Sequence, residues 1–240
     1  TNKIKPKITF DEFNNKYITD KIKPKITFDE FNNKYITGNK KPILLILPGS
    51  RKPEIDKLLN IYLNAVENCN FYDNFSLVLP IKKQLASYVR NIINAKKISF
   101  DVTILDDEEA KYESFVVADY AIATSGTVAL ELSYFNIAYL VAYKFNFFSY
   151  AIIKSLAQTK FANLINIINN QGDIPELIQT QCTADKIGKK LEKIISDDEY
   201  KKSILHASEV AIAQLNCKEN PSSLAAKEVI HMLKNGKWDL

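Results

Sequence analysis

The chain has 240 residues, of which 46% are hydrophobic, and a formal net charge of +4. This is enough apolar material for one packed domain and a small second one, whereas two large domains would not fit. Because the lysines are interspersed with Asp and Glu, the charge does not indicate a nucleic-acid surface. No apolar run reaches the length of a membrane span. Three widely separated cysteines favour a reducing, cytoplasmic location over a disulfide framework or a zinc site.

An exact duplication dominates the N-terminus, where residues 3–19 recur unchanged as residues 21–37. Two copies fall short of the roughly three repeats that a solenoid needs to bury a core. We therefore expect residues 1–40 to be a duplicated, flexible insertion outside the core fold. Asn pairs favour turns, so Asn32-Asn33 is predicted as a turn. The open alternative is an arm that binds a partner through its interleaved aromatic and lysine side chains.

Five short, continuous apolar runs follow, of the kind that form parallel strands buried on both faces. Helical periods separate them, and the acidic run at 106–109 is read as a helix start rather than a metal cluster. The predicted fold is α/β, a doubly wound Rossmann-like domain over residues 41–182, whose ligands bind at the carboxyl ends of the strands. The strands are predicted at 43–47, 75–79, 102–105, 120–123 and 138–142, and the helices at 54–66, 83–93, 109–117 and 127–135.

The last part of the chain, residues 183–240, is predicted to be a helical tail. Apolar positions recur there at intervals of three and four residues, with helix starts at Asp197-Asp198 and Pro221-Ser222. A more apolar helix is expected at 145–159, and it either packs in the core or touches a lipid surface. The tail helices are predicted at 184–195, 198–217 and 222–234.

A phosphate-binding turn is predicted directly after the first strand, at Pro48-Gly49-Ser50-Arg51. Glycine permits a close turn, Ser50 can donate its hydroxyl hydrogen, and Arg51 offers a planar fork of donors suited to phosphate oxygens. The alternative from these four residues alone is an ordinary loop with a surface arginine, because short glycine motifs recur by chance.

A second turn of this kind, Ser125-Gly126-Thr127, follows the fourth strand. It can present hydroxyls and helix N-terminal amides to an anion. Glu131 lies one helical turn beyond Thr127, where its carboxylate can accept both hydroxyls of a ribose, although an ordinary solvated carboxylate is the alternative. Two such turns in one open sheet indicate a site for a nucleoside diphosphate.

Residues 43–230 resemble the C-terminal half of lipid-A-disaccharide synthase, a glycosyltransferase of the GT-B type. This resemblance implies that the domain is the donor-binding half of a GT-B fold, in which two Rossmann-like halves face each other across a cleft. The matching motifs keep their order and spacing, which makes them more specific than any single motif. They are Leu47-Pro-Gly-Ser-Arg51, Ser125-Gly-Thr-Val-Ala-Leu-Glu131, Val141-Ala-Tyr143, Tyr150-Ala-Ile-Ile-Lys-Ser-Leu, Asn163-Leu-Ile-Asn166 and Pro175-Glu-Leu-Ile-Gln179 with Cys182-Thr183.

The family implies a reaction that uses neither a metal nor a cofactor. Diacylglucosamine passes from UDP-2,3-diacylglucosamine to lipid X with inversion, at the cytoplasmic face of the inner membrane. The resemblance gives each matching residue an expected role. These residues are Gly49, Ser50 and Arg51 at the diphosphate, Ser125, Gly126 and Thr127 beside it, Glu131 at the ribose and Asn166 at the sugar.

Departures from the family pattern leave three functions open. Lys144 stands where the family usually has Arg, Ile165 where it has Pro, and residues 169–172 replace an Ala-Gly-Arg-Glu stretch. The matching region excludes the N-terminal half, which in the family carries the acceptor surface and the general base, so the catalytic residues are unknown. The chain is a donor-binding half that works with a separately encoded N-terminal half, an inactive truncated relative that binds UDP-sugar, or a sugar-nucleotide epimerase of related architecture.

Overall fold

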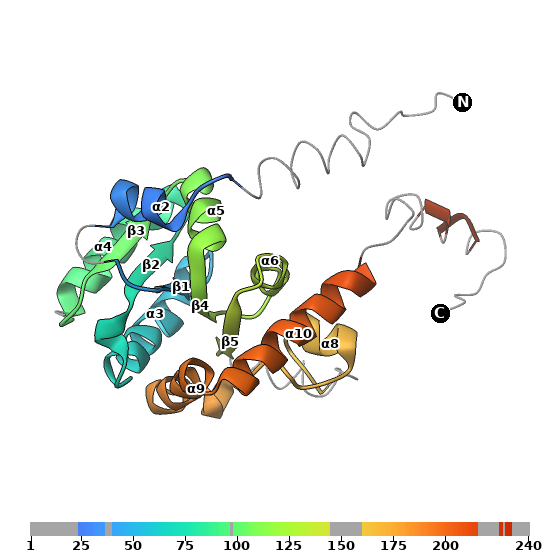
Figure 1. Cartoon of the computed structure of the whole chain (residues 1–240). Helices are drawn as coiled ribbons and strands as arrows, with labels where there is room; N and C mark the ends of the chain where they lie inside the picture. The colour runs from blue at the N-terminus through green and yellow to red at the C-terminus, as the bar shows by residue number, and fades with distance from the viewer. Residues whose placement is uncertain are drawn as a thin grey trace, which may run out of the picture.

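The structure, a computed structural model, describes residues 24–36, 40–96, 98–144, 160–215, 226–227 and 229–231. Its centre is a six-stranded, fully parallel sheet with the strand order β3-β2-β1-β4-β5-β6 (Figure 1). This doubly wound order confirms the predicted Rossmann-like α/β fold. The strands are β1 (Ile43–Leu47), β2 (Ser76–Pro80), β3 (Val102–Leu105), β4 (Ala118–Ala123), β5 (Ala138–Tyr143) and β6 (Glu176–Ile178).

Helices connect the strands and cover the sheet, so that the apolar strands are buried. In β1 every residue is buried, as a strand covered on both faces requires. Helices α3 (Lys52–Glu67) and α9 (Ala184–Ser196) pack against each other, and α2 (Phe28–Tyr35) packs on α5 (Glu108–Val117) across the sheet from them (Figure 1). The other helices are α4 (Lys83–Lys96), α6 (Val128–Tyr134), α8 (Leu164–Asn169) and α10 (Asp198–Leu215), with short 3-10 turns η2 (Tyr72–Asn74) and η3 (Gln179–Gln181).

All five predicted strands are present, with ends that differ by no more than two residues, and the four helices between them are confirmed. The prediction missed the sixth strand and α8. Strand β6 has only three residues and begins with a charged Glu176, so it lacks an apolar run. It nevertheless pairs with β5 along Val141 to Tyr143. Helix α8 has six residues, too few to show a periodic pattern.

The expectation that both repeat copies lie outside the core is wrong for the second copy. Residues Phe28–Tyr35 form α2, in which Phe31 is fully buried in the main hydrophobic core. Asn32 is helical and buried rather than in a turn. Thr27 and Glu30 form a capping box that starts this helix, and such local bonds outweigh the turn preference of the asparagines. The first copy lies outside the described residues.

Helix α2 is also tied to α5 through a carboxylate that is almost completely buried. Lys34 Nζ lies 3.0 Å from Glu113 Oε2, and the Tyr35 hydroxyl donates to the same oxygen at 2.6 Å. Glu113 is only 6% exposed, and a buried carboxylate needs such partners. The second copy of the repeat is therefore fixed to the domain by both apolar and charged contacts.

The predicted tail helices at 184–195 and 198–217 are present as α9 and α10. Ile187, Leu191 and Ile204 from these helices belong to the same hydrophobic core as the sheet. The predicted helix at 145–159 and most of the one at 222–234 lie outside the described residues. Within the described part of the chain, no helix combines the length and apolar character needed to cross a membrane.

Candidate functional site

A cavity of about 970 Å³ opens at the carboxyl ends of the parallel strands. Its wall includes the last residues of β1, β2 and β5 and the residues that directly follow β3 and β4. The strand order reverses between β1 and β4, which are neighbours in the sheet although β2 and β3 separate them in sequence. Ligands of doubly wound folds bind at such a reversal. The cavity therefore lies where the fold itself places a ligand site.

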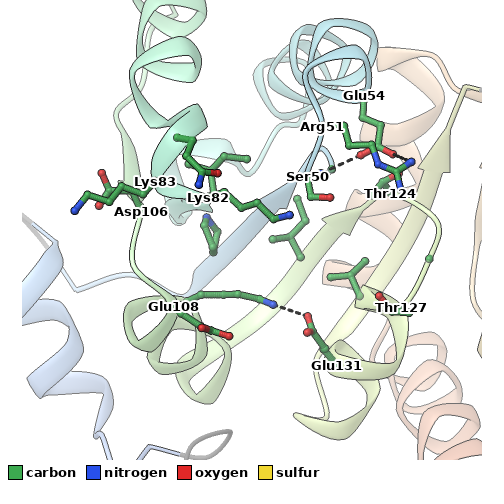
Figure 2. A pocket seen from close by; sticks show the side chains of 18 of the residues that line it. Ser50, Arg51, Glu54, Lys82, Lys83, Asp106, Glu108, Thr124, Thr127 and Glu131 are labelled. Carbon is green, nitrogen blue, oxygen red and sulfur yellow. Dashed lines mark hydrogen bonds and ion pairs between the residues drawn. The ribbon is translucent and has the colours of Figure 1, made fainter. Parts of the chain in front are cut away.

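The structure brings seven of the eight predicted site residues together around this cavity. The turn after β1 and the turn after β4 stand on either side of the strand reversal, as Figure 2 shows for Ser50, Arg51 and Thr127. Glu131 reaches the same space from α6. The seven residues are Gly49, Ser50, Arg51, Ser125, Gly126, Thr127 and Glu131.

Asn166 is the exception, because the structure does not bring it to the cavity, and its expected place at the sugar stays a prediction. It is 1% exposed and does not line the cavity. Its Oδ1 accepts a hydrogen bond from the Ile174 amide at 2.9 Å, and its Nδ2 donates to Ile174 O and to Glu176 Oε1. Glu176 also accepts from the amides of Ala162 and Asn163. Asn166 thus helps to attach α8 to β6.

The turn after β1 depends on a glycine. Gly49 has a φ of +114°, and a Cβ built on it would lie 2.4 Å from Glu54 Oε2 and 2.7 Å from Glu54 Cβ. Glu54 is the third residue of α3, and its Oε2 accepts a hydrogen bond from the Ser50 amide at 2.9 Å. Arg51 lies next to this carboxylate, with 3.7 Å between its Nη1 and Glu54 Oε1, and its side chain is 79% exposed. The guanidinium is therefore accessible to a ligand.

The turn after β4 is built differently. Gly126 has a φ of +134°, but a Cβ there would meet no atom of the described residues within 4 Å. The Ser125 hydroxyl donates to Ala162 O at 2.9 Å, so its hydrogen is already used. Thr124 is 8% exposed, and its hydroxyl has no hydrogen-bond partner among the described residues. Its amide donates to Leu47 O, which fixes the end of β4 beside the start of the Gly49 turn.

The difference between these glycines gives a stability prediction. Gly126→Ala should cost about 1–3 kcal/mol through backbone strain alone. Gly49→Ala should cost about 1–3 kcal/mol more, because the added methyl group also collides with Glu54 close to the α3 backbone. Urea denaturation of both variants measures the loss in their free energy of unfolding. Equal losses for the two variants would show that the contact with Glu54 relaxes without cost.

The Glu131 carboxylate is held in place by α5. Lys111 Nζ donates to Glu131 Oε2 at 2.7 Å, and the Tyr112 hydroxyl lies 3.4 Å from Oε1. Burial raises the pKa of Tyr112 to about 12, and the negative charges of Glu131 and Glu108 add to this. Tyr112 therefore stays a neutral donor at physiological pH. A ribose that binds Glu131 has to share the carboxylate with Lys111.

Several cavity residues were missed by the sequence analysis. Lys82 and Lys83 follow β2, and Figure 2 shows Lys82 directed into the cavity. The rule that ligands bind at the carboxyl ends of strands would have found them. Tyr143 at the end of β5 also lines the cavity; burial raises the pKa of its phenol, and the nearby Glu54 charge raises it further while Arg51 lowers it.

Asp106, Asp107 and Glu108 after β3 also line the cavity, and this acidic run begins α5, as predicted. The Asp107 side chain caps α5 by accepting from the Ala110 amide at 3.1 Å. Among the described residues, no group of three or more His, Cys, Asp or Glu side chains is arranged to hold a metal ion.

Comparison with known proteins identifies the family. The profile of the family described as lipid-A-disaccharide synthetase matches residues 16–230. The chain belongs to this family. It is 37% identical over 191 residues to lipid-A-disaccharide synthase of Rickettsia bellii and 33% identical over 189 residues to that of Rickettsia prowazekii. Each match covers 77% of this chain and 49% of the relative. The chain thus spans about half the length of these relatives.

Solved structures agree on the fold of a GT-B half. The glycosyltransferase WaaG, which is involved in lipopolysaccharide biosynthesis, has a TM-score of 0.52 at 13% identity, covering 87% of this chain and 51% of WaaG. UDP-GlcNAc 2-epimerase from Neisseria meningitidis, bound to UDP-GlcNAc, gives 0.51 at 16% identity, covering 78% of this chain and 48% of the epimerase. At these identities the likeness concerns the fold alone, so the epimerase match does not indicate epimerase activity.

Proposed function

We propose that this chain supplies the UDP-sugar-binding half of a lipid-A-disaccharide synthase. The reaction would be the transfer of 2,3-diacylglucosamine from UDP-2,3-diacylglucosamine to lipid X. One observation carries the proposal: in a chain of this family, both predicted glycine turns and Glu131 line one cavity at the strand reversal. The observation favours a nucleotide ligand because such reversals are where doubly wound folds bind nucleotides.

The cavity offers a separate partner for each part of UDP. The diphosphate would lie between the two turns. Arg51, which follows β1, and Lys82, which follows β2, would supply positive charge there. The ribose hydroxyls would bind the carboxylate of Glu131, whose position Lys111 fixes. As the glycosidic bond to UDP breaks, negative charge develops on the diphosphate, and Arg51 is the group we expect to stabilise it.

The acceptor and the general base would come from the half of the family protein that this chain does not match. That half would be encoded separately or belong to a longer form of this protein, and the pair would work at the cytoplasmic face of the membrane. The alternative is a relative that binds UDP-sugar without turnover. Both alternatives require a UDP site in this chain, so UDP binding is the first property to measure.

Isothermal titration calorimetry with UDP tests the site. If Glu131 binds both ribose hydroxyls, Glu131→Ala should weaken UDP binding by about 1.5–3 kcal/mol, the range for hydrogen bonds to charged groups. This corresponds to roughly ten- to 150-fold. Glu109→Ala is the matched control, because Glu109 is exposed on the neighbouring helix and does not line the cavity.

Each outcome has a definite meaning. Equal UDP affinity for Glu131→Ala and the unaltered chain would remove Glu131 from the site. No UDP binding by the unaltered chain would overturn the proposed function.

A further inference from the structure

Glu54 occupies the turn that the proposed function assigns to the diphosphate. Its Oε2 accepts the hydrogen bond from the Ser50 amide at 2.9 Å, and its Oε1 lies 3.7 Å from Arg51 Nη1. Its side chain is 18% exposed and forms part of the cavity wall. A carboxylate and a phosphate oxygen seek the same donors, namely backbone amides and guanidinium groups. Glu54 therefore already binds two groups that a phosphate would use.

The contact with Gly49 shows how closely Glu54 fits this turn. Its Oε2 lies 2.4 Å from where a Cβ of residue 49 would be, so the carboxylate lies directly against the glycine backbone. The Ser50 amide has one hydrogen, and Glu54 accepts it. A phosphate cannot approach this amide while the carboxylate is bound there, both because the space is filled and because the two groups repel each other.

We propose that Glu54 is an internal anion that holds the Gly49 turn in the empty site and is displaced by the diphosphate of the ligand. This inference rests on the proposed function and adds to it a positioning residue that sets the affinity for the donor. In the empty site, Glu54 keeps the turn closed and Arg51 near the cavity. When the diphosphate binds, it takes over the Ser50 amide and Arg51, and the Glu54 side chain turns away.

A buried hydroxyl nearby fits such an exchange. Thr124 lines the same cavity and is bound through its amide to Leu47 O, two residues before Gly49. Its hydroxyl has no partner among the residues that the structure describes. An unpaired buried hydroxyl is unfavourable, so a ligand atom that paired with it would gain free energy. If Glu54 turns away when the ligand binds, the diphosphate can occupy the side of the cavity where Thr124 lies.

The test compares UDP with uridine, which lacks the diphosphate. Glu54→Gln keeps the size of the side chain and an acceptor for the Ser50 amide, but it removes the negative charge. Calorimetry should show UDP binding about three- to tenfold tighter in Glu54→Gln, equivalent to about 0.7–1.4 kcal/mol, with uridine affinity unchanged. Asp56→Asn is the control, because it removes the same charge from an exposed position of α3 outside the cavity.

Glu54→Ala repeats the measurement in case Glu54→Gln does not fold, which circular dichroism checks. UDP affinity that is equal or weaker in the folded variants would overturn this inference and leave Glu54 as a cap that fixes the turn. A gain for both UDP and uridine would also overturn it, because displacement by the diphosphate affects UDP alone. No UDP binding by the unaltered chain or any variant would overturn the proposed function, and this inference with it.

Discussion

Replacing Phe13 and Phe31 together by alanine is expected to lower the free energy of unfolding by about 3–5 kcal/mol, the usual cost for a buried phenylalanine. Phe31→Ala alone is expected to cost only about 1 kcal/mol. Phe31 is fully buried, so its loss would leave a cavity in the core. In the single variant, however, we expect the first copy of the repeat to take the place of the second. Phe13 stands in an identical sequence, with equivalents of the capping box and of the Lys34 and Tyr35 side chains that bind Glu113.

The difference between the copies is the length of chain that connects them to β1. Seven residues, 36–42, separate Tyr35 from Ile43, whereas 25 residues, 18–42, separate Tyr17 from Ile43. The entropy of loop closure then favours the second copy by roughly sevenfold, or about 1.1 kcal/mol. This gap is the expected cost of exchanging one copy for the other in Phe31→Ala. For the same reason Phe13→Ala alone should have almost no effect.

Urea denaturation of the three variants measures these differences, and the two single variants serve as controls for the double one. The signature of exchange is that the double substitution costs far more than the sum of the single ones. If Phe31→Ala alone costs as much as the double variant, the first copy cannot replace the second. If the double variant loses nothing, packing of α2 does not contribute to stability.

The sequence predicted the sheet well because the information for a buried parallel strand is local. Residues such as Ile43 to Leu47 are apolar at every position, and this run is readable without knowing what covers it. The turns at Gly49 and Gly126 were predicted for a related reason, since a glycine within a few residues of a strand end marks a backbone conformation that other residues rarely adopt.

The structure differs from the sequence-based expectations at residues whose positions depend on distant partners. Phe31 is in the core because α2 packs on α5, where Glu113 binds Tyr35. Glu113 lies 78 residues further along the chain than Tyr35. Asn166 was expected at a sugar by resemblance, whereas the structure places it away from the cavity, with its side-chain amide bonded to Ile174 and Glu176. No local pattern shows which of these alternatives the fold selects.

The cavity also combines features that the sequence could predict with features that it could not. The position of Glu131 one turn after Thr127 follows from helix geometry, so its place in the cavity was predictable. The pairing of Glu131 with Lys111 could not be predicted from the sequence, because α5 and α6 belong to different crossovers of the sheet. The partners of a site residue, which decide its availability to a ligand, thus require the structure.

The purified chain by itself is expected to show no measurable transfer of diacylglucosamine to lipid X, even when it binds UDP. Inverting transfer requires a base within about 3 Å of the acceptor hydroxyl, and a positioned base contributes about 10²–10⁴-fold. Holding donor and acceptor together contributes roughly another 7–11 kcal/mol. This chain spans about half the length of its relatives, and we expect the acceptor site and the base in the other half.

A transfer assay with radiolabelled donor and lipid X, run with and without the N-terminal half of the Rickettsia bellii relative, measures this. Turnover by the isolated chain would refute the half-enzyme proposal. Activity that appears only when the other half is added would identify a competent donor half, whereas its absence would favour an inactive UDP-binding relative. Arg51→Ala should abolish any restored activity, because we expect Arg51 to stabilise the departing UDP. Arg90→Ala should not, because Arg90 pairs with Asp106 and does not line the cavity.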